Sequence, residues 1–370
     1  MLNTLFDTTL IGGLPHDGLE SPQQERGGPA QPLLIVNHLT KHFTIRSGIV
    51  DKLFGRKAKA VHAVDDINFV VAKGETLGIV GESGCGKSTT ARLIARLMPP
   101  DSGAMIFDGD GVAEFGGMEL KDFRQNLQMV FQDSHASLNP RLTIGETIAY
   151  GPHVHGLDRA AAMERAHDLL SRVGLEPAQF AMRYPHELSG GQRQRVNIAR
   201  ALAFEPRLVI LDEAVAALDK SVQAQVLNLL QELKKERQLT YLFISHDLHV
   251  VRYISDRVMV MYLGQIVEIG PVDRIFGASA HPYTRALLSA VPSMDPANRT
   301  MTSPLSGDPP NPIDPPSGCR FRSRCQYAKA VCAIKMPVLQ LLSEGERHMA
   351  ACHLNDPASE HPDAVARVAA

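Results

Sequence analysis

The 370-residue sequence has no tryptophan, and aromatic residues make up only 5% of it. It also lacks an excess of either charge, since 38 basic residues stand against 40 acidic ones for a net charge of −2. Nucleic acids and anionic membranes attract proteins through an excess of basic residues. The overall charge therefore gives no support for direct binding to either.

Long apolar runs are also missing. A helix that spans a bilayer needs about 18 or more consecutive apolar residues, and one of the most apolar stretches, Val258–Leu263, is far shorter. Residues 1–30 mix Gly, Pro and acidic residues, without the basic start and apolar run of a secretory signal. We therefore expect a cytosolic protein whose membrane location would come from a partner.

What the sequence does contain is a glycine-rich stretch, 81–89, that fits the pattern G-x-x-x-x-G-K-[ST]. A strand-like segment at 76–80 precedes it and a helical pattern at 90–97 follows it, which is the order that a phosphate-binding loop requires. Glycines let the backbone curl so that several N–H groups face an anion. The expected nucleotide contacts are Gly81, Glu82, Ser83, Gly84, Cys85, Gly86, Lys87, Ser88 and Thr89. Lys87 should reach the β- and γ-phosphates, and Ser88 should ligate Mg²⁺.

Two carboxylates follow a buried, strand-like run at 208–211. Opposite a phosphate loop, Asp212 would hold the Mg²⁺ shell. Glu213 would orient the attacking water and accept its proton. Without the phosphate loop, the pair could equally be a solvated strand end.

A second glycine pair occurs in Ser189-Gly190-Gly191-Gln192, just before a helical segment. Ser189 alone could be only a helix cap. However, the two glycines expose N–H groups beside a positive helix end, which makes a second anion site in one chain. One nucleotide needs one cradle, so we expect two chains to meet head to tail. Each would offer Ser189 and residues 190–192 to the γ-phosphate held by the other.

Together with Gln132, Ala217-Leu218-Asp219 and His246, these motifs stand in the order found in ATP-binding cassette (ABC) ATPases, which residues 33–270 resemble. The resemblance implies that Gln132 senses Mg²⁺ and the transport domain. It also implies that Asp219 lies in the dimer-contact loop and that His246 contacts the γ-phosphate, beside Lys87 and Glu213 as catalytic groups.

ABC ATPases also stack an aromatic ring on adenine from a loop well before the phosphate loop. Phe43 matches that position best, and His62 is the alternative. Three residues usual in the family are replaced here, two prolines by Ser134 and Ala214 and a serine by Ala216. None of these changes removes a phosphate, metal or proton-transfer group, so we expect ATP hydrolysis with ATP and Mg²⁺ as cofactors.

A narrower resemblance extends to about residue 353. Residues 131–133, 137–141 and His281-Pro282-Tyr283-Thr284, with the C-terminal cysteine region, are similar to ATP-binding subunits of bacterial dipeptide/oligopeptide importers. This implies two membrane-spanning permease subunits, an extracytoplasmic peptide-binding protein and a second, non-identical ATPase chain. The chain would then sit at the cytoplasmic face of the membrane. Importers of nickel chelates or glutathione, and a soluble ABC ATPase without transport, are the alternatives.

Four of the five cysteines, Cys319, Cys325, Cys332 and Cys352, follow a proline-rich stretch at 304–316. Their spacing, C-x5-C-x6-C-x19-C, lacks the short C-x2-C pair of many zinc sites. Four irregularly spaced thiolates suit a [4Fe–4S] cluster. The resemblance to peptide importers of this type also implies a C-terminal cluster motif of this kind. Zinc, or thiols without metal, remain the alternatives.

Strand-like and helical segments alternate along the chain, which predicts an α/β fold with a mainly parallel sheet. With the resemblance, we expect an ABC ATPase domain at 32–270 that includes an N-terminal antiparallel β subdomain and an inserted helical subdomain at 133–188. A small C-terminal extension with the cysteines would cover 271–355. Flexible tails would occupy 1–31 and 356–370.

Overall fold

The structure is a computed structural model that describes residues 31–45, 59–112, 117–134, 136–290, 311–313, 315–342 and 347–364. Nearly all of the predicted N-terminal tail therefore lies outside the described residues. So does most of the proline-rich stretch at 304–316. Of the predicted tail at 356–370, residues 356–364 are described; they include the short helix η4 (Pro357–Ser359) and the buried side chain of His361.

The larger of two sheets has eight strands in the order β11-β12-β10-β9-β3-β8-β7-β6. In that order the strands are Gln340–Leu341, Met349–Ala350, Gln265–Pro271, Arg257–Tyr262, Thr76–Val80, Thr240–Ile244, Leu208–Asp212 and Leu127–Val130. The five strands from β9 to β6 are parallel. Because parallel strands end at the same edge, the segments that follow β3, β6, β7 and β8 meet there.

Apolar side chains on both faces hold this sheet between two hydrophobic clusters. In β7, Leu208 and Ile210 join the cluster beneath the smaller sheet, whereas Val209 and Leu211 join the cluster on the helical side. All four are nearly inaccessible to solvent. This two-sided burial explains why the sequence of β7 is an unbroken apolar run.

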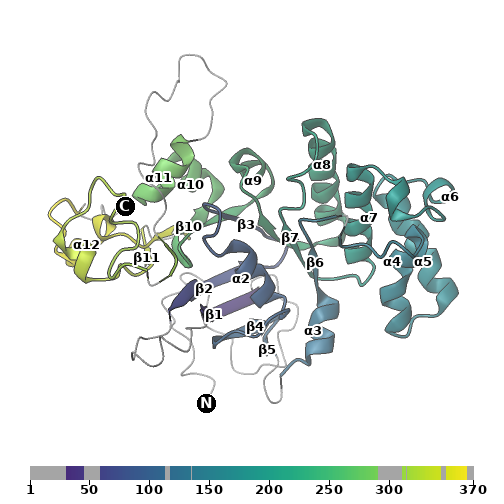
Figure 1. Cartoon of the computed structure of the whole chain (residues 1–370), viewed down its shortest axis with the longest axis horizontal. Coiled ribbons are helices and arrows are strands. Elements are labelled where there is room, and N and C mark those ends of the chain that lie inside the picture. Colours follow the sequence, from purple (N-terminus) through teal and green to yellow (C-terminus); the bar gives the residue numbers. More distant parts are fainter. Residues whose placement is uncertain are drawn as a thin grey trace.

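The smaller sheet is antiparallel, in the order β2-β1-β4-β5. Its strands are Ala60–Ala72, Pro32–Thr44, Ser102–Phe107 and Asp110–Gly111. Helix α2 (Lys87–Ile94) buries Ala91, Leu93 and Ile94 in the cluster that this sheet shares with the larger one (Figure 1). The start of α2 is thereby fixed at the edge where the parallel strands end.

A helical group lies at one end of the molecule, shown in teal in Figure 1. It contains α4 (Ile144–Val154), α5 (Arg159–Arg172), α6 (Pro177–Phe180), η2 (Pro185–Glu187) and α7 (Gly190–Leu202). Helix α4 starts with a capping box between Thr143 and Glu146. Both α4 and α5 pack against α7, which links the group to the sheet. The remaining helices of the core are α3 (Leu120–Asn126), α8 (Lys220–Arg237), α9 (Leu248–Ile254) and α10 (Val272–Gly277).

The C-terminal lobe, defined here as the described residues from 315 to 364, lies at the opposite end (yellow in Figure 1). It contains α12 (Ala330–Ile334), β11, β12, η3 (His353–Asn355) and η4, and it follows α11 (Pro282–Ser289). β12 pairs with β10, so the lobe extends the large sheet. In the described part of the chain, no helix combines the length and apolarity that crossing a membrane requires.

The predicted fold class is confirmed: an α/β core with a mainly parallel sheet carries an antiparallel β subdomain, a helical subdomain and a small C-terminal extension. Strand β1 is continuous over 13 residues, with irregular pairing to β2 between Val36 and Lys41.

Candidate nucleotide site

The phosphate loop owes its shape to two crowded glycines. Gly81 has φ of 150° and Gly86 has φ of 108°. A Cβ at Gly81 would lie 2.2 Å from the Met261 carbonyl oxygen, and one at Gly86 would lie 2.1 Å from the Ala63 carbonyl oxygen. Any side chain at either position would therefore displace the loop. Ser83 and Gly84 are exposed at its tip, whereas Cys85 is buried behind it.

Lys87, the first residue of α2, turns its ammonium group back over the loop. Its Nζ donates to the carbonyl oxygens of Gly81 at 2.8 Å and Glu82 at 3.0 Å. Its side chain is buried. A cation fixed at the mouth of the loop suits a bound β- or γ-phosphate. Thr89 is half-buried one turn into the same helix.

Ser88 and Asp212, two of the three predicted magnesium ligands, are in direct contact. The Ser88 hydroxyl donates to Asp212 Oδ1 at 3.0 Å, which joins the start of α2 to the end of β7. Burial raises the pKa of Asp212, the Ser88 hydrogen bond opposes that rise, and the charge of Glu213 adds to it. A hydroxyl and a carboxylate in contact are the oxygen ligands that Mg²⁺ takes in such sites.

Glu213 sits in a left-handed backbone conformation, φ 49°, just after β7. Its N–H donates to the Ile244 carbonyl oxygen at the end of β8. Its carboxylate accepts from Gln132 Nε2 at 2.9 Å and lies 3.4 Å from His246 Nδ1. The structure thus brings Gln132, Glu213 and His246 together from three neighbouring strand ends.

Ser189 starts α7 with a capping box, in which it and Gln192 bond each other's backbone N–H groups. Gly191 packs against α8, where a Cβ would lie 2.4 Å from Val222 Cγ1, while Gly190 has open space around it. Ser189 is exposed. In Figure 1, α7 lies well away from α2, so this motif does not contribute to the phosphate loop of its own chain.

Phe43 is the last residue but one of β1, opposite Val61, and is 41% exposed. Lys41 Nζ lies 5.8 Å from its ring centroid. The alternative residue, His62, is half-buried, and its ring centroid lies 3.9 Å from that of His42, with the two rings tilted by 32°. Phe43 is therefore the more exposed ring of the two. Asp219 is exposed at the start of α8.

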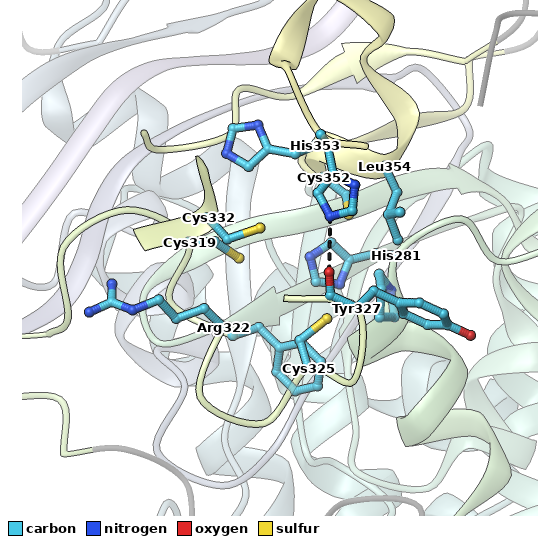
Figure 2. A pocket seen from close by; sticks show the side chains of 12 residues that line it. His281, Cys319, Arg322, Cys325, Tyr327, Cys332, Cys352, His353 and Leu354 are labelled. Carbon is cyan, nitrogen blue, oxygen red and sulfur yellow. Dashed lines mark hydrogen bonds between the residues drawn. The ribbon is translucent and has the colours of Figure 1, made fainter. Parts of the chain in front are cut away.

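The four C-terminal cysteines line one pocket in the C-terminal lobe and point toward its centre (Figure 2). All four are free thiols. Burial raises the pKa of Cys319 to about 11 and that of Cys352 to about 12. Arg322 also lines the pocket, and its buried Nη1 has no hydrogen-bond partner among the described residues.

Sequence reasoning missed one set of contacts at the site. The sequence predicts Glu82 in the phosphate loop but indicates no partner for its side chain. In the structure, Glu82 forms a bidentate ion pair with Arg324 of the C-terminal lobe. Its N–H donates to the hydroxyl of Tyr283, the tyrosine of the His-Pro-Tyr-Thr motif. No local feature of either segment signals this contact, since the two residues lie 242 positions apart.

A family model for ABC transporters matches residues 64–216, and a model for the oligopeptide/dipeptide transporter C-terminal region matches residues 267–332. A probable peptide ABC transporter ATP-binding protein of Sinorhizobium fredii is 49% identical over 91% of this chain and 95% of its own length. The chain belongs to the ABC transporter ATP-binding proteins. It is accordingly an ATPase, and the predicted ATP–Mg²⁺ chemistry is confirmed at that level.

Other relatives of this ABC ATPase support the same family. The oligopeptide transport ATP-binding protein AppF of Bacillus subtilis is 48% identical over 88% of this chain and 98% of its own. OppF of Haemophilus influenzae is 48% identical over 86% and 96%. Among solved structures, CbiO1 of Clostridium perfringens matches with a TM-score of 0.56 and 29% identity, over 67% of this chain and 91% of that one. A dimeric ATP-binding cassette with bound ADP and phosphate has a TM-score of 0.55 and 28% identity, over 65% and 98%.

Proposed function

We propose that this chain is the ATP-hydrolysing subunit of an importer of dipeptides or oligopeptides. The observation that carries the proposal is the joint match of the ATPase core and of the C-terminal transporter region to relatives named for peptide transport. Nickel-chelate and glutathione importers remain the alternative substrates, because solute choice belongs to partner subunits. As partners we propose two permease subunits, an extracytoplasmic peptide-binding protein and a second, non-identical ATPase chain.

In this function each residue at the strand ends has its own chemical role. Lys87 and the loop N–H groups bind the phosphates, while Ser88, Asp212 and Gln132 hold Mg²⁺. Glu213 accepts the proton of the attacking water, and His246 contacts the γ-phosphate. Phe43 stacks on adenine. Ser189 and the N–H groups of residues 190–192 complete the γ-phosphate site of a facing chain, with Asp219 in the contact between the two.

Coupling to transport follows from two states of this pair. ATP closes the two chains around the nucleotides, and hydrolysis at Glu213 lets them reopen. Gln132 lies where the parallel core meets the helical subdomain, so a permease helix docked on that subdomain would sense the change. The chain would then be held at the cytoplasmic face of the membrane by its permeases.

Purification from native membranes tests the transport assignment. A tagged copy of this chain should bring down two hydrophobic permease chains in mild detergent, and the associated binding protein should carry peptides. A chain recovered free of permeases, with full ATPase activity in the soluble fraction, would point to a non-transport ABC ATPase. A nickel chelate or glutathione on the binding protein would replace the peptide assignment.

We further propose that Cys319, Cys325, Cys332 and Cys352 hold a [4Fe–4S] cluster. Four thiolates around one zinc ion would lie about 3.8 Å apart given Zn–S bonds of ~2.3 Å. No three of these sulfurs come within 4.8 Å of one another in the described residues, so a wider group fits better. Such a cluster would supply crosslinks for a lobe with little regular structure.

Metal analysis of anaerobically purified protein decides between these alternatives. The proposal expects about four iron and four sulfide per chain. One zinc per chain, or no metal, would remove the iron–sulfur assignment and leave the ATPase assignment intact.

A further inference from the structure

The segment between Cys319 and Cys325 carries three arginines at alternate positions, 320, 322 and 324. Arg322 lines the cysteine pocket, with its guanidinium directed away from the sulfurs (Figure 2). Arg320 and Arg324 both contact the nucleotide core. One short segment of the C-terminal lobe is therefore anchored between two candidate cluster ligands and reaches the phosphate loop.

Arg324 makes the closest of these contacts. Its Nη1 and Nη2 donate to the two carboxylate oxygens of Glu82 at 2.8 and 3.0 Å. The side chains are only 5% and 20% exposed, unlike those of most surface ion pairs. The paired geometry and partial burial make this contact stronger than an exposed pair.

Glu82 is itself part of the phosphate cradle. Its carbonyl oxygen accepts from Lys87 Nζ, the cation expected at the phosphates. Its N–H donates to Tyr283 Oη at 2.9 Å, and Tyr283 is fully buried, with its ring 4.6 Å from that of Tyr262 and 5.4 Å from that of Phe321. Helix α11 thus fixes the backbone of Glu82, and the C-terminal lobe fixes its side chain.

Arg320 provides a second, parallel link. It donates to the Leu263 carbonyl oxygen and to Asp65. The next residue after Leu263, Gly264, donates its N–H to the Cys85 carbonyl oxygen at 2.8 Å. The lobe therefore supports both sides of the phosphate loop, at Glu82 and at Cys85.

Charge explains why the pair with Glu82 matters for the nucleotide. A carboxylate on a loop that cradles a polyphosphate repels the ligand unless a cation neutralises it and holds it aside. Arg324 is the cation in contact with this carboxylate. Removing the guanidinium would leave a negative charge next to the phosphates and a loop with one support fewer.

We propose that Arg324 is a positioning residue of the nucleotide site, which aligns and neutralises the phosphate loop through Glu82, so that the C-terminal lobe sets the affinity for ATP. The proposal rests on ATP binding at this loop and is independent of which group the cysteines hold. By linkage, bound ATP must stabilise the contact between the loop and the lobe to the same extent.

A double-mutant cycle on the full chain tests this role, with a fluorescent ATP analogue for affinity and steady-state ATPase kinetics for kcat and KM. Arg324→Met should weaken ATP binding about tenfold, with most of the loss in KM. Adding Arg324→Met to Glu82→Gln should cost little further affinity, so the double variant should match Glu82→Gln and bind ATP more tightly than Arg324→Met, because the repelling charge is gone. Arg324→Lys, which keeps the charge, should recover a large part of the affinity.

Lys329→Met is the matched control, since Lys329 pairs with Asp363 in the same lobe with both side chains about half exposed. It should leave the affinity unchanged. Parent-like affinity in Arg324→Met overturns the proposal. So does a double variant as weak as Arg324→Met, because that result assigns the loss to damage of the lobe. A parent chain that fails to bind ATP would instead overturn the nucleotide site itself.

Hydrogen exchange gives a second readout that does not depend on turnover. ATP should slow amide exchange in residues 319–325 of the parent and have at most a small effect there in Arg324→Met. Equal protection in both chains would contradict the link between the phosphate loop and the lobe.

Discussion

Helices α2 and α7 both begin at a glycine-containing motif, yet their surroundings differ sharply. At α2, Lys87 is buried and Ser88 is bonded to Asp212. At α7, Ser189 is exposed, its side chain bonds within its own capping box, and a Cβ at Gly190 would meet open space. One helix start is surrounded by the proposed catalytic groups, and the other is exposed.

A helix N-terminus therefore becomes a phosphate site only when suitable side chains surround it. The start of α2 carries the Lys87 ammonium and the Ser88 hydroxyl, and it faces the carboxylates of Asp212 and Glu213 at the end of β7. The start of α7 offers N–H donors with no anion to receive them in its own chain. This is what we expect if each chain supplies half of two composite sites.

The largest effect should come from the α2 side of the comparison. Glu213→Gln keeps the hydrogen-bonding shape but cannot accept a proton, so turnover should fall about 10³-fold while ATP stays bound. Phosphate release and nucleotide retention would measure the two effects. Glu232→Gln, an exposed change on α8, should hydrolyse ATP like the parent. Parent-like turnover in Glu213→Gln would refute the assignment of the base.

Next in size is the α7 side. Ser189→Arg fills the space before the glycines and should lower ATPase activity about 100-fold, as expected for loss of donors to a developing charge. ATP affinity of the single chain should stay near the parent value, because the motif is remote from its own loop. Ser171→Arg, an exposed serine on α5, is the control. Equal loss of ATP affinity in the single chain would show that α7 does not act in a second chain.

A smaller effect separates the two adenine candidates. Phe43→Ala removes a base-stacking ring and should weaken ATP binding about tenfold, with kcat little changed. His62→Ala should have less effect on ATP affinity, because that ring is half-buried and already packed against His42. Titration with ATP and with inorganic triphosphate checks the reason, since triphosphate has no base to stack. If the order of the two variants is reversed, adenine lies against His62.

The smallest effect concerns a departure from the family. Ala216, which stands where the resemblance to ABC ATPases implies a serine, is exposed between β7 and α8. Ala216→Ser should change kcat/KM by less than about threefold, as is usual for exposed positions. A change above tenfold in steady-state ATPase assays would show that this residue takes part in communication between chains.

The nucleotide core was predictable because its chemistry is local in sequence. The phosphate loop needs a strand, glycines and a helix in order, and the run 208–213 places two carboxylates at a strand end by itself. The structure adds how the pieces meet: Gln132, Glu213 and His246 are separated by tens of residues and converge through parallel strand pairing.

The link between the lobe and the loop could not be derived from the sequence. Glu82 and Arg324 lie 242 positions apart. Nothing local in either segment indicates its partner, since a glutamate in a loop and an arginine beside a cysteine usually meet solvent. The pairing of β12 with β10, the packing of Tyr283 on Phe321 and the hydrogen bonds of Arg320 bring the two segments into contact.

The most direct test of the half-site account mixes two inactive variants of this chain, at concentrations where the chain pairs with a copy of itself in place of its non-identical partner. Lys87→Ala lacks its own phosphate cation, and Ser189→Arg lacks the motif it offers to a partner. In a mixed pair, one site combines the intact phosphate loop of the second variant with the intact α7 start of the first. ATPase activity should therefore reappear on mixing, to about a quarter of the parent level if pairs form at random and each site works alone. Two variants that pair but stay inactive together would contradict the account.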